Sequence, residues 1–141
     1  MTNDNIIRIG TGILIVNDEG KVLMGKRQGS HGAHTWALIG GYIEHGESFE
    51  QAAQREAMEE VGVTLKDVRV LKPVTYFFND GAKHHITIYM AARIASGTPR
   101  ICEPHKMTEL RFVDWNNIPQ PTFVPYHEEV DAQVIEAYRK K

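Results

Sequence analysis

The alternation of hydrophobic and polar positions predicts a chain that mixes strands and helices. The predicted strands are rich in β-branched and aromatic residues and lie at residues 6–18, 21–27, 37–44, 68–80, 83–94 and 110–115. The turn residues Asp18-Glu19-Gly20 are expected to join the first two runs into a hairpin. In the same way, Asn79-Asp80-Gly81 is expected to join the fourth and fifth runs into a second hairpin.

Two helices complete the predicted elements. Ser48 and Gln51 have the spacing of a capping box, and Gly62 is a typical helix stop. A helix is therefore expected over about residues 49–61. A closing helix is expected near the end of the chain from hydrophobic residues spaced four apart and from two lysines that suit its C-terminal dipole: Val130, Val134, Tyr138, Lys140 and Lys141.

Length and composition narrow the class of protein. The chain has 141 residues, of which 42% are hydrophobic and 24% charged, with a formal net charge of -2. Because no linker or repeat interrupts it, residues 1–141 are expected to form one domain with helices packed on sheet. No basic excess points to duplex nucleic acid as a partner. The single Cys102, and the lack of a signal sequence or of an apolar run that could span a membrane, predict a cytoplasmic location.

The first predicted helix carries an acidic cluster on the side expected to face the sheet. Glu56, Glu59 and Glu60 converge on one helix face because they are spaced i, i+3 and i+4. The small residues on the same side are Ala52, Ala53 and Ala57, while Met58 points away. Burying like charges is costly, and a hard divalent cation is the usual compensation. The cluster thus predicts a metal site, against the simpler alternative of a solvated face with an Arg55–Glu59 ion pair.

The segment around this helix fits a longer pattern, G-x5-E-x7-R-E-U-x-E-E-x-G-U, in which U is aliphatic. The matching positions are Gly41, Glu47, Arg55, Glu56, Ala57, Glu59, Glu60, Gly62 and Val63. This pattern resembles the signature of the Nudix hydrolases. Residues 22–41, 84–90 and 103–123 resemble its MutT-like branch, which hydrolyses nucleoside triphosphates. The resemblance implies an α/β/α sandwich around a mixed β-sheet.

The resemblance also implies a reaction and a set of site residues. Family members hydrolyse a nucleoside diphosphate linked to another group, with water as nucleophile and Mg²⁺, or alternatively Mn²⁺, as cofactor. For this chain the implied substrate is a nucleoside triphosphate, including oxidised or non-standard dNTPs, cleaved to a nucleoside monophosphate and pyrophosphate. The implied metal ligands are Glu56, Glu59, Glu60 and the carbonyl of Gly40. The implied catalytic residues are Arg55, Glu56 and Glu59, with the choice of general base left open, and the supporting residues are Gly41, Glu47 and Glu103.

The same resemblance implies a pocket for the base, made by Arg27, Leu38, Thr87 and Phe123. Each residue also has a plain structural interpretation, as core, strand or surface ion pair. Phe123 is the strongest candidate because an aromatic side chain in a proline-bounded loop suits stacking on a base. Trp36 is a second aromatic candidate.

Two departures from the family pattern bear on the substrate. Ile39 stands where related triphosphatases usually have proline, so the loop keeps Gly40 and Gly41 but loses a constraint on φ. His105 and Leu110 stand where relatives often carry glutamate and tryptophan, near the expected base pocket. The base preference therefore stays open.

Several alternatives remain beside the triphosphatase hypothesis. A Nudix enzyme could act on a nucleotide sugar, a dinucleoside polyphosphate or an isoprenyl diphosphate. A nucleotide-binding module without catalysis is disfavoured because such modules are expected to lose carboxylates of the Nudix pattern, which is complete here. The seven histidines do not favour zinc, since His84 and His85 should point to opposite faces of a strand and His31 and His34 have no third ligand at metal spacing. Relatives commonly form homodimers, but the sequence locates no interface.

Overall fold

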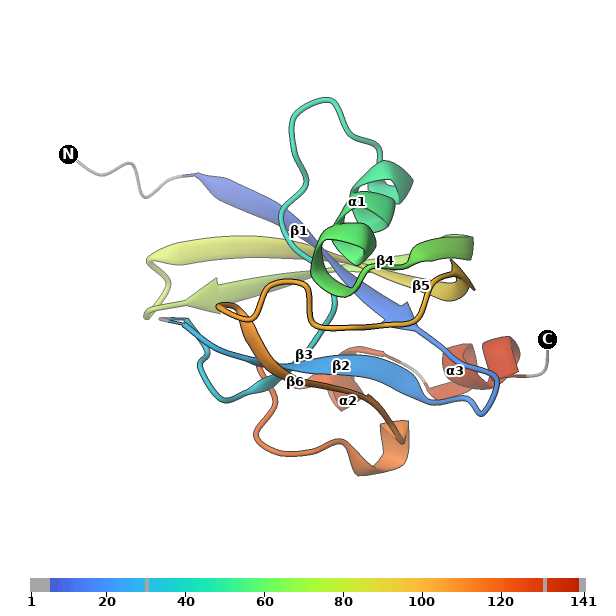
Figure 1. Cartoon of the computed structure of the whole chain (residues 1–141). Helices are drawn as coiled ribbons and strands as arrows, with labels where there is room; N and C mark the ends of the chain where they lie inside the picture. Colours follow the sequence, from blue (N-terminus) through green and yellow to red (C-terminus); the bar gives the residue numbers. More distant parts are fainter. Residues whose placement is uncertain (1–5, 30, 131, 140–141) are drawn as a thin grey trace.

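Strands dominate the first three-quarters of the chain and short helices close it. The computed structural model describes residues 6–29, 31–130 and 132–139. Its strands are β1 (Ile7–Ile15), β2 (Val22–Arg27), β3 (Trp36–Leu38), β4 (Thr64–Phe78), β5 (Lys83–Ser96) and β6 (Met107–Val113). Its helices are α1 (Phe49–Val61), the 3₁₀ helix η1 (Trp115–Asn117), α2 (Tyr126–Glu129) and α3 (Ala132–Arg139). Figure 1 shows their arrangement in space.

The described strands form two three-stranded sheets, with the orders β1-β5-β4 and β3-β2-β6. The first sheet is mixed, because β1 runs parallel to β5 while β4 runs antiparallel to it. In the second sheet both pairings are antiparallel. The predicted α/β class with a mixed sheet is therefore confirmed (Figure 1).

The first predicted hairpin is wrong. A tight turn does follow β1, where the Asn17 side chain accepts hydrogen bonds from the backbone N–H groups of Glu19 and Lys21. However, the bridge between Val16 and Val22 beside this turn is isolated, and β1 and β2 belong to different sheets. The reason is that β1 is buried on both faces at its C-terminal end, as parallel strands usually are, so it lies in the interior instead of forming a hairpin arm.

The second predicted hairpin is confirmed. β4 and β5 pair from Thr64 opposite Ser96 to Phe78 opposite Lys83. The turn between them has positive φ at Asn79 and at the two residues that follow, with values of 53°, 55° and 90°. Asparagine, aspartate and glycine tolerate this backbone region best, which is why the turn was visible in the sequence.

Helix α1 has the predicted bounds and both predicted caps. The Ser48 hydroxyl accepts a hydrogen bond from the backbone of Gln51 at 3.1 Å, and the Gln51 side chain accepts one from the backbone of Ser48 at 2.8 Å. At the other end, Gly62 has a left-handed φ of 73° and its N–H bonds the carbonyls of Ala57 and Met58. These caps fix where the glutamate-bearing face begins and ends.

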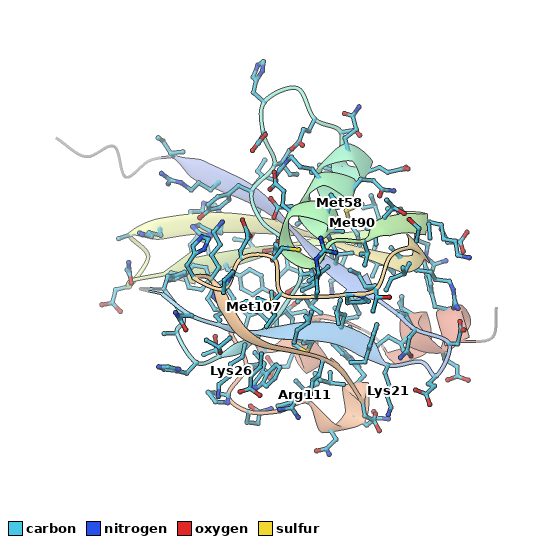
Figure 2. All side chains as sticks on the ribbon, in the orientation of Figure 1. Lys21, Lys26, Met58, Met90, Met107 and Arg111 are labelled. Carbon is cyan, nitrogen blue, oxygen red and sulfur yellow. The ribbon has the colours of Figure 1, made fainter. Side chains whose placement is uncertain are left out.

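Two hydrophobic clusters lie on opposite faces of the sheets and complete the sandwich. On one side, Ala53, Ala57 and Val61 of α1 pack with Ile13 and other residues that are also buried. On the other side, the C-terminal helices contribute Tyr126, Ile135 and Tyr138 to a cluster with Leu14, Tyr89 and Trp115. Successive residues of β1 thus face opposite sides of the sheet and belong to different clusters. Met58 points away as predicted, with 47% exposure, whereas Met90 is fully buried (Figure 2).

Three smaller predictions need correction. The strand expected at 37–44 narrows to β3 and continues only as isolated bridges at Ile39 and Tyr42. The strand expected at 110–115 begins earlier and ends at Val113, where Asp114 caps η1. The closing helix is divided, because Val130 is extended at the end of α2.

Lys140 and Lys141 lie outside the described residues. Over the described ranges, no helix is long and apolar enough to cross a membrane.

Candidate active site

Two glutamates of α1 turn their carboxyl groups inward and lie together. The Glu56 residue is only 9% exposed, and Glu60 accepts a hydrogen bond from the N–H of Gly40 at 3.2 Å. Burial raises the pKa of Glu60 well above its ordinary value, and the hydrogen bond and charge of Glu56 and the charge of Glu103 raise it further. The inner face of α1 therefore holds a pair of carboxyl groups whose full ionisation is costly.

Glu59, the third glutamate of the predicted cluster, lies differently. Its side chain is 51% exposed and its carboxylate contacts Arg55 Nη1 at 3.1 Å. Within the described part of the chain, no three acidic, histidine or cysteine side chains are already grouped to hold a metal ion. The structure thus brings Glu56 and Glu60 together and places the Glu59 side chain on the solvent-exposed side of the helix.

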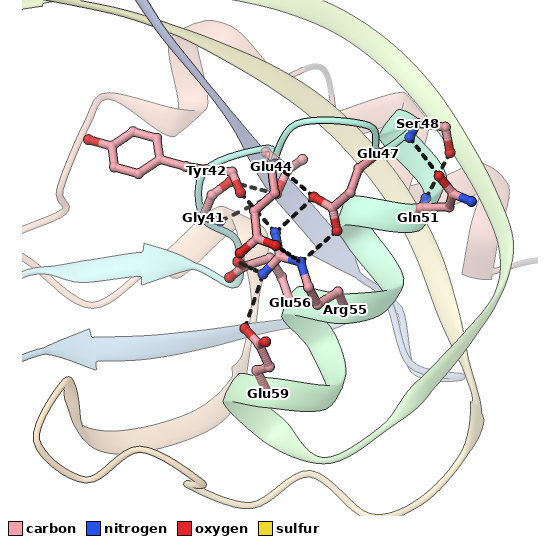
Figure 3. A network of polar contacts seen from close by, with 10 residues as sticks. Gly41, Tyr42, Glu44, Glu47, Ser48, Gln51, Arg55, Glu56 and Glu59 are labelled. Atoms are coloured by element: carbon pink, nitrogen blue, oxygen red, sulfur yellow. Dashed lines mark hydrogen bonds and ion pairs between the residues drawn. The ribbon is translucent and has the colours of Figure 1, made fainter.

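Arg55 is the hub of a polar network that ties the loop before α1 to the helix (Figure 3). Its Nε and Nη2 donate to the two oxygens of Glu47 at 2.6 and 3.0 Å. Nη1 donates to Glu56 at 2.7 Å, and Nη2 also donates to the carbonyl of Tyr42 at 2.9 Å. These bonds raise the pKa of Arg55 and lower the pKa of Glu47, so both groups are charged and fixed in place.

The glycines before α1 allow the loop to lie against the carboxyl pair. A Cβ atom on Gly41 would lie 2.5 Å from an oxygen of Glu56, which is closer than real side chains approach. The Gly41 carbonyl is held by Thr11, whose N–H and hydroxyl lie 2.8 and 3.3 Å away. A side chain at this position would therefore displace the carboxyl group.

A cleft of about 600 Å³ opens beside these groups. It is lined by the predicted metal and catalytic residues Gly40, Arg55, Glu56, Glu59 and Glu60, and by the predicted supporting residues Gly41 and Glu103. The predicted base-pocket residues Arg27, Leu38, Thr87 and Phe123 line the same cleft. Residues from distant parts of the sequence thus share one site of the size expected for a small-molecule ligand.

The aromatic part of the cleft is built around Phe123. The guanidinium carbon of Arg27 lies over this ring at 4.3 Å from its centroid, and Arg27 Nε donates to the carbonyl of His31 at 3.1 Å. Phe78 and His31 are further ring neighbours, at 5.9 and 5.2 Å between centroids. Partial burial, with the nearby charge of Arg27, lowers the pKa of His31, so this imidazole is neutral near neutral pH.

Leu38 and Thr87 lie where two strands meet the cleft. The N–H of Leu38 donates to the hydroxyl of Tyr126 at 3.2 Å, and burial raises the pKa of that hydroxyl. Thr87 lies on β5 beside Gly10 of β1 in the parallel register. Both residues are therefore held by regular structure, which suits a pocket wall.

Some predicted residues lie elsewhere. Glu47 does not line the cleft and acts on it through Arg55. Trp36 is 3% exposed in the core, with Arg111 4.6 Å from its ring centroid, so it is not a stacking platform. His105 and Leu110 do not line the cleft either. Both residues are next to lining residues, because His105 precedes Lys106 and Leu110 pairs with Gly25, so their expected influence on the base pocket stays a prediction.

Sequence reasoning missed several residues of the cleft wall, namely Tyr42, Tyr76, Phe78, His85, Tyr89 and Lys106. Tyr76 and Phe78 alternate along β4 and so share one face, and Tyr76 lies opposite His85 in the register of the second hairpin. That alternation was a usable signal. His84 contacts Phe77 while His85 contacts Tyr42 and Phe78, as expected for neighbours on opposite strand faces.

The carboxyl pair fits a divalent cation. Burial and the nearby Glu56 disfavour ionisation of Glu60, so a cation that replaces the proton removes this cost, and the carboxylate oxygens are hard donors that Mg²⁺ and Mn²⁺ accept. The loop at Gly40 and Gly41 approaches the pair closely, since the Gly40 N–H donates to Glu60 and an added Cβ on Gly41 would meet Glu56. The donor chemistry, and not the resemblance alone, is therefore compatible with a metal site here.

Comparison with known proteins identifies the family. The family described as NUDIX domain matches residues 7–135, so the chain belongs to the Nudix family. Among solved structures, a MutT NUDIX hydrolase from Burkholderia pseudomallei is 32% identical, with a TM-score of 0.78 over 84% of this chain and 91% of that one. The MutT protein from Methanosarcina mazei Go1 has a TM-score of 0.73 over 99% and 100% of the two chains, and at 21% identity it supports the fold alone.

Curated relatives match a shorter segment. The chain is 45% identical over 71 residues to an RNA pyrophosphohydrolase of Klebsiella pneumoniae (strain 342), which covers 50% of this chain and 39% of that protein. It is 48% identical over 64 residues to an RNA pyrophosphohydrolase of Vibrio cholerae, covering 45% and 36%. The match therefore spans less than two-fifths of the length of these relatives.

Proposed function

We propose that this protein is a metal-dependent pyrophosphohydrolase that converts a nucleoside triphosphate into a nucleoside monophosphate and pyrophosphate. The observation that carries the proposal is the sharing of one cleft by the Glu56–Glu60 carboxyl pair and the aromatic group around Phe123. The first suits a cation that accompanies a polyphosphate, and the second suits a planar base. Family membership and the MutT NUDIX hydrolase from Burkholderia pseudomallei support the same reaction class.

The residues that would hold the cation are Glu56, Glu60, the outward Glu59 and the carbonyl of Gly40. A bound Mg²⁺ or Mn²⁺ supplies positive charge that offsets the charge of the polyphosphate and favours ionisation of water. We expect Glu59 to join the pair by a change of side-chain rotamer, because its carboxylate is exposed and contacts Arg55 at the outer side of the helix (Figure 3). Glu103, whose charge acts on Glu60, supports the same site.

The protein's own groups position the reaction. Arg55 holds Glu56 through Nη1 and is itself fixed by Glu47, so the Glu56 carboxylate keeps its orientation when substrate enters. In the overall step, a water oxygen bonds to phosphorus and the bond to the bridging oxygen breaks. The bridging oxygen leaves with that bond's electron pair, in pyrophosphate if the α-phosphorus is attacked and in the monophosphate if the β-phosphorus is attacked. The water proton passes to a carboxylate, for which Glu56 and Glu59 are the candidates.

A second substrate is favoured by the curated relatives, which are named RNA pyrophosphohydrolases. The 5′-triphosphate end of an RNA presents the same base, sugar and triphosphate as a free nucleotide, so the same cleft could accept it. It differs in the chain that follows the first nucleotide. A short single-stranded RNA with a 5′-triphosphate is therefore the natural competitor of a free triphosphate, and it does not require binding of a duplex.

The test is a panel of phosphate compounds assayed with and without Mg²⁺. It should contain ordinary and oxidised dNTPs, rNTPs, a 5′-triphosphate RNA, a nucleotide sugar, a dinucleoside polyphosphate and an isoprenyl diphosphate. We expect metal-dependent formation of monophosphate and pyrophosphate from a triphosphate, with a label from H₂¹⁸O appearing in one of the two products. Binding of nucleotides without turnover would instead identify a binding module. Turnover of a diphosphate compound, with none of any triphosphate, would change the proposed substrate to that class of compound.

We propose that the chain acts as one domain in the cytoplasm, and gel filtration with light scattering tests whether it forms the homodimer that is common among relatives.

A further inference from the structure

The ring of Phe123 is already surrounded when no base is bound. Arg27 lies over it at 4.3 Å, His31 meets it edge-on at 87°, and Phe78 lies nearly parallel to it, with 24° between planes and 5.9 Å between centroids. This is the spacing of two rings in offset contact, which leaves no room for a base between them. A base that stacks on Phe123 has to displace one of these neighbours.

Phe78 is the neighbour whose side chain is held by packing alone, because phenylalanine carries no polar side-chain atom. Phe123 is anchored by its N–H, which donates to the carbonyl of Trp36 at 2.9 Å, and Arg27 is anchored by the carbonyl of His31 at 3.1 Å. Phe78 is the last residue of β4, directly before the turn of the second hairpin. Its backbone carbonyl accepts the N–H of Gly81 at 3.2 Å, while its half-buried side chain packs on the core cluster and contacts other rings, including His85 at 5.2 Å. Strand ends beside turns move more easily than strand centres.

We propose that Phe78 and Phe123 are the two jaws of an aromatic clamp that opens to take a base between them. The inference rests on the proposed function and deepens it by naming Phe78 as a residue that selects the substrate. Stacking on both faces rewards the larger ring system, so the clamp favours purine over pyrimidine nucleotides. His31, edge-on to both rings at 5.4 and 5.2 Å, closes one side of the clamp and keeps the jaws aligned.

The neighbouring residue on the same strand supplies a matched control. Phe77 is 65% exposed, contacts His84 with 4.7 Å between centroids, and does not line the cleft. The variants Phe78→Leu and Phe77→Leu therefore remove one aromatic ring each, one residue apart, while keeping an apolar side chain that protects the fold. Phe78→Tyr restores the ring at the clamp position.

The experiment measures KM and kcat with Mg²⁺ for a purine and a pyrimidine triphosphate, and inhibition by ribose 5-triphosphate, which lacks a base. For Phe78→Leu we expect KM for the purine triphosphate to rise about tenfold, a smaller rise for the pyrimidine, and little change in kcat or in inhibition by ribose 5-triphosphate. Phe77→Leu should match the wild type throughout, and Phe78→Tyr should recover most of the purine KM.

An unchanged purine KM in Phe78→Leu, in an enzyme that turns over triphosphates normally, would overturn the clamp and leave the proposed function intact. Equal losses for the purine and for ribose 5-triphosphate would also overturn it, because they would place Phe78 outside the base site. A wild type that neither binds nor hydrolyses any triphosphate would overturn the proposed function first, and the clamp with it.

Discussion

Arg55 and Glu47 form a bidentate ion pair, with Nε 2.6 Å from one carboxylate oxygen and Nη2 3.0 Å from the other. Both side chains are mostly shielded from solvent, at 21% and 16% exposure. The pair lies eight residues apart in sequence and joins the loop before α1 to the helix. It leaves Nη1 free to hold Glu56 and Glu59, so the order of the acidic face depends on it.

Replacing Arg55 with lysine should lower both stability and activity. A lysine keeps the charge but cannot make the parallel pair of bonds to Glu47 while also reaching Glu56. We expect a loss of about 1–3 kcal/mol in the free energy of unfolding, measured by urea denaturation. The control is Arg8→Lys at an exposed position, which should stay close to the wild type. Equal stability of the two variants would contradict the role of Arg55.

The lowered pKa of Glu47 predicts a pH dependence of stability. Because its folded pKa lies below the ordinary value of 4.5, the unfolded chain takes up this proton first as the pH falls. The stability that Glu47 contributes is therefore fully present above about pH 4.5 and is lost as the pH falls through the folded pKa. Urea unfolding at pH values from 7 down to 3 should show a shallower acid slope in Glu47→Gln. Identical slopes would argue against the pair.

The N-terminal cap of α1 should contribute measurably to stability. Ser48→Ala removes the hydroxyl that accepts from Gln51, and we expect a loss of about 1 kcal/mol. Ser48→Asp restores an acceptor near the positive end of the helix dipole and should recover most of the loss. A thermal melt of the three proteins is sufficient, and an alanine variant as stable as the wild type would contradict the cap.

Glu60 should lower the stability of the protein without metal and should bind the cation when metal is present. Because burial and Glu56 raise its pKa, the folded state favours the neutral acid, and its stabilising effect at low pH is lost as the pH rises through the folded pKa. At neutral pH without metal, Glu60→Gln should therefore melt at the same temperature as the wild type or higher. Mg²⁺ should raise the melting temperature of the wild type only. A variant that still responds to Mg²⁺ would place the cation elsewhere.

The features that could be predicted correctly from the sequence were local ones. Ser48, Gln51 and Gly62 mark the ends of α1 by their own capping chemistry, so its bounds could be predicted to the residue. The convergence of Glu56, Glu59 and Glu60 on one face could be predicted from their spacing on that helix. The hairpin wrongly predicted between β1 and β2 depends on long-range pairing instead. Val16 and Val22 are close in sequence, but β1 pairs with β5, in which His84, the partner of Ile7, lies 77 residues further along the chain. Only long-range packing decides that choice.

For the same reason, only part of the cleft could be predicted from the sequence. Glu56, Glu60 and Gly41 come from one continuous segment, whereas Phe78 and Phe123 meet only after the second hairpin and the late loop have both folded. Trp36 failed as a stacking candidate because it begins the short strand β3 and its large ring is buried in the core. The outward turn of Glu59 depends on Arg55, and side-chain competition of this kind is not written in helical spacing.

The most direct measurement is the rate of pyrophosphate release from a nucleoside triphosphate in Mg²⁺ by the wild type, Glu60→Gln and Glu50→Gln. Glu50 lies in the first turn of the same helix and is exposed, so it controls for the loss of one helix carboxylate. We expect Glu60→Gln to lose at least about a hundredfold in kcat/KM and Glu50→Gln to match the wild type. A Glu60→Gln protein as active as the wild type would contradict a catalytic site built on the Glu56–Glu60 pair.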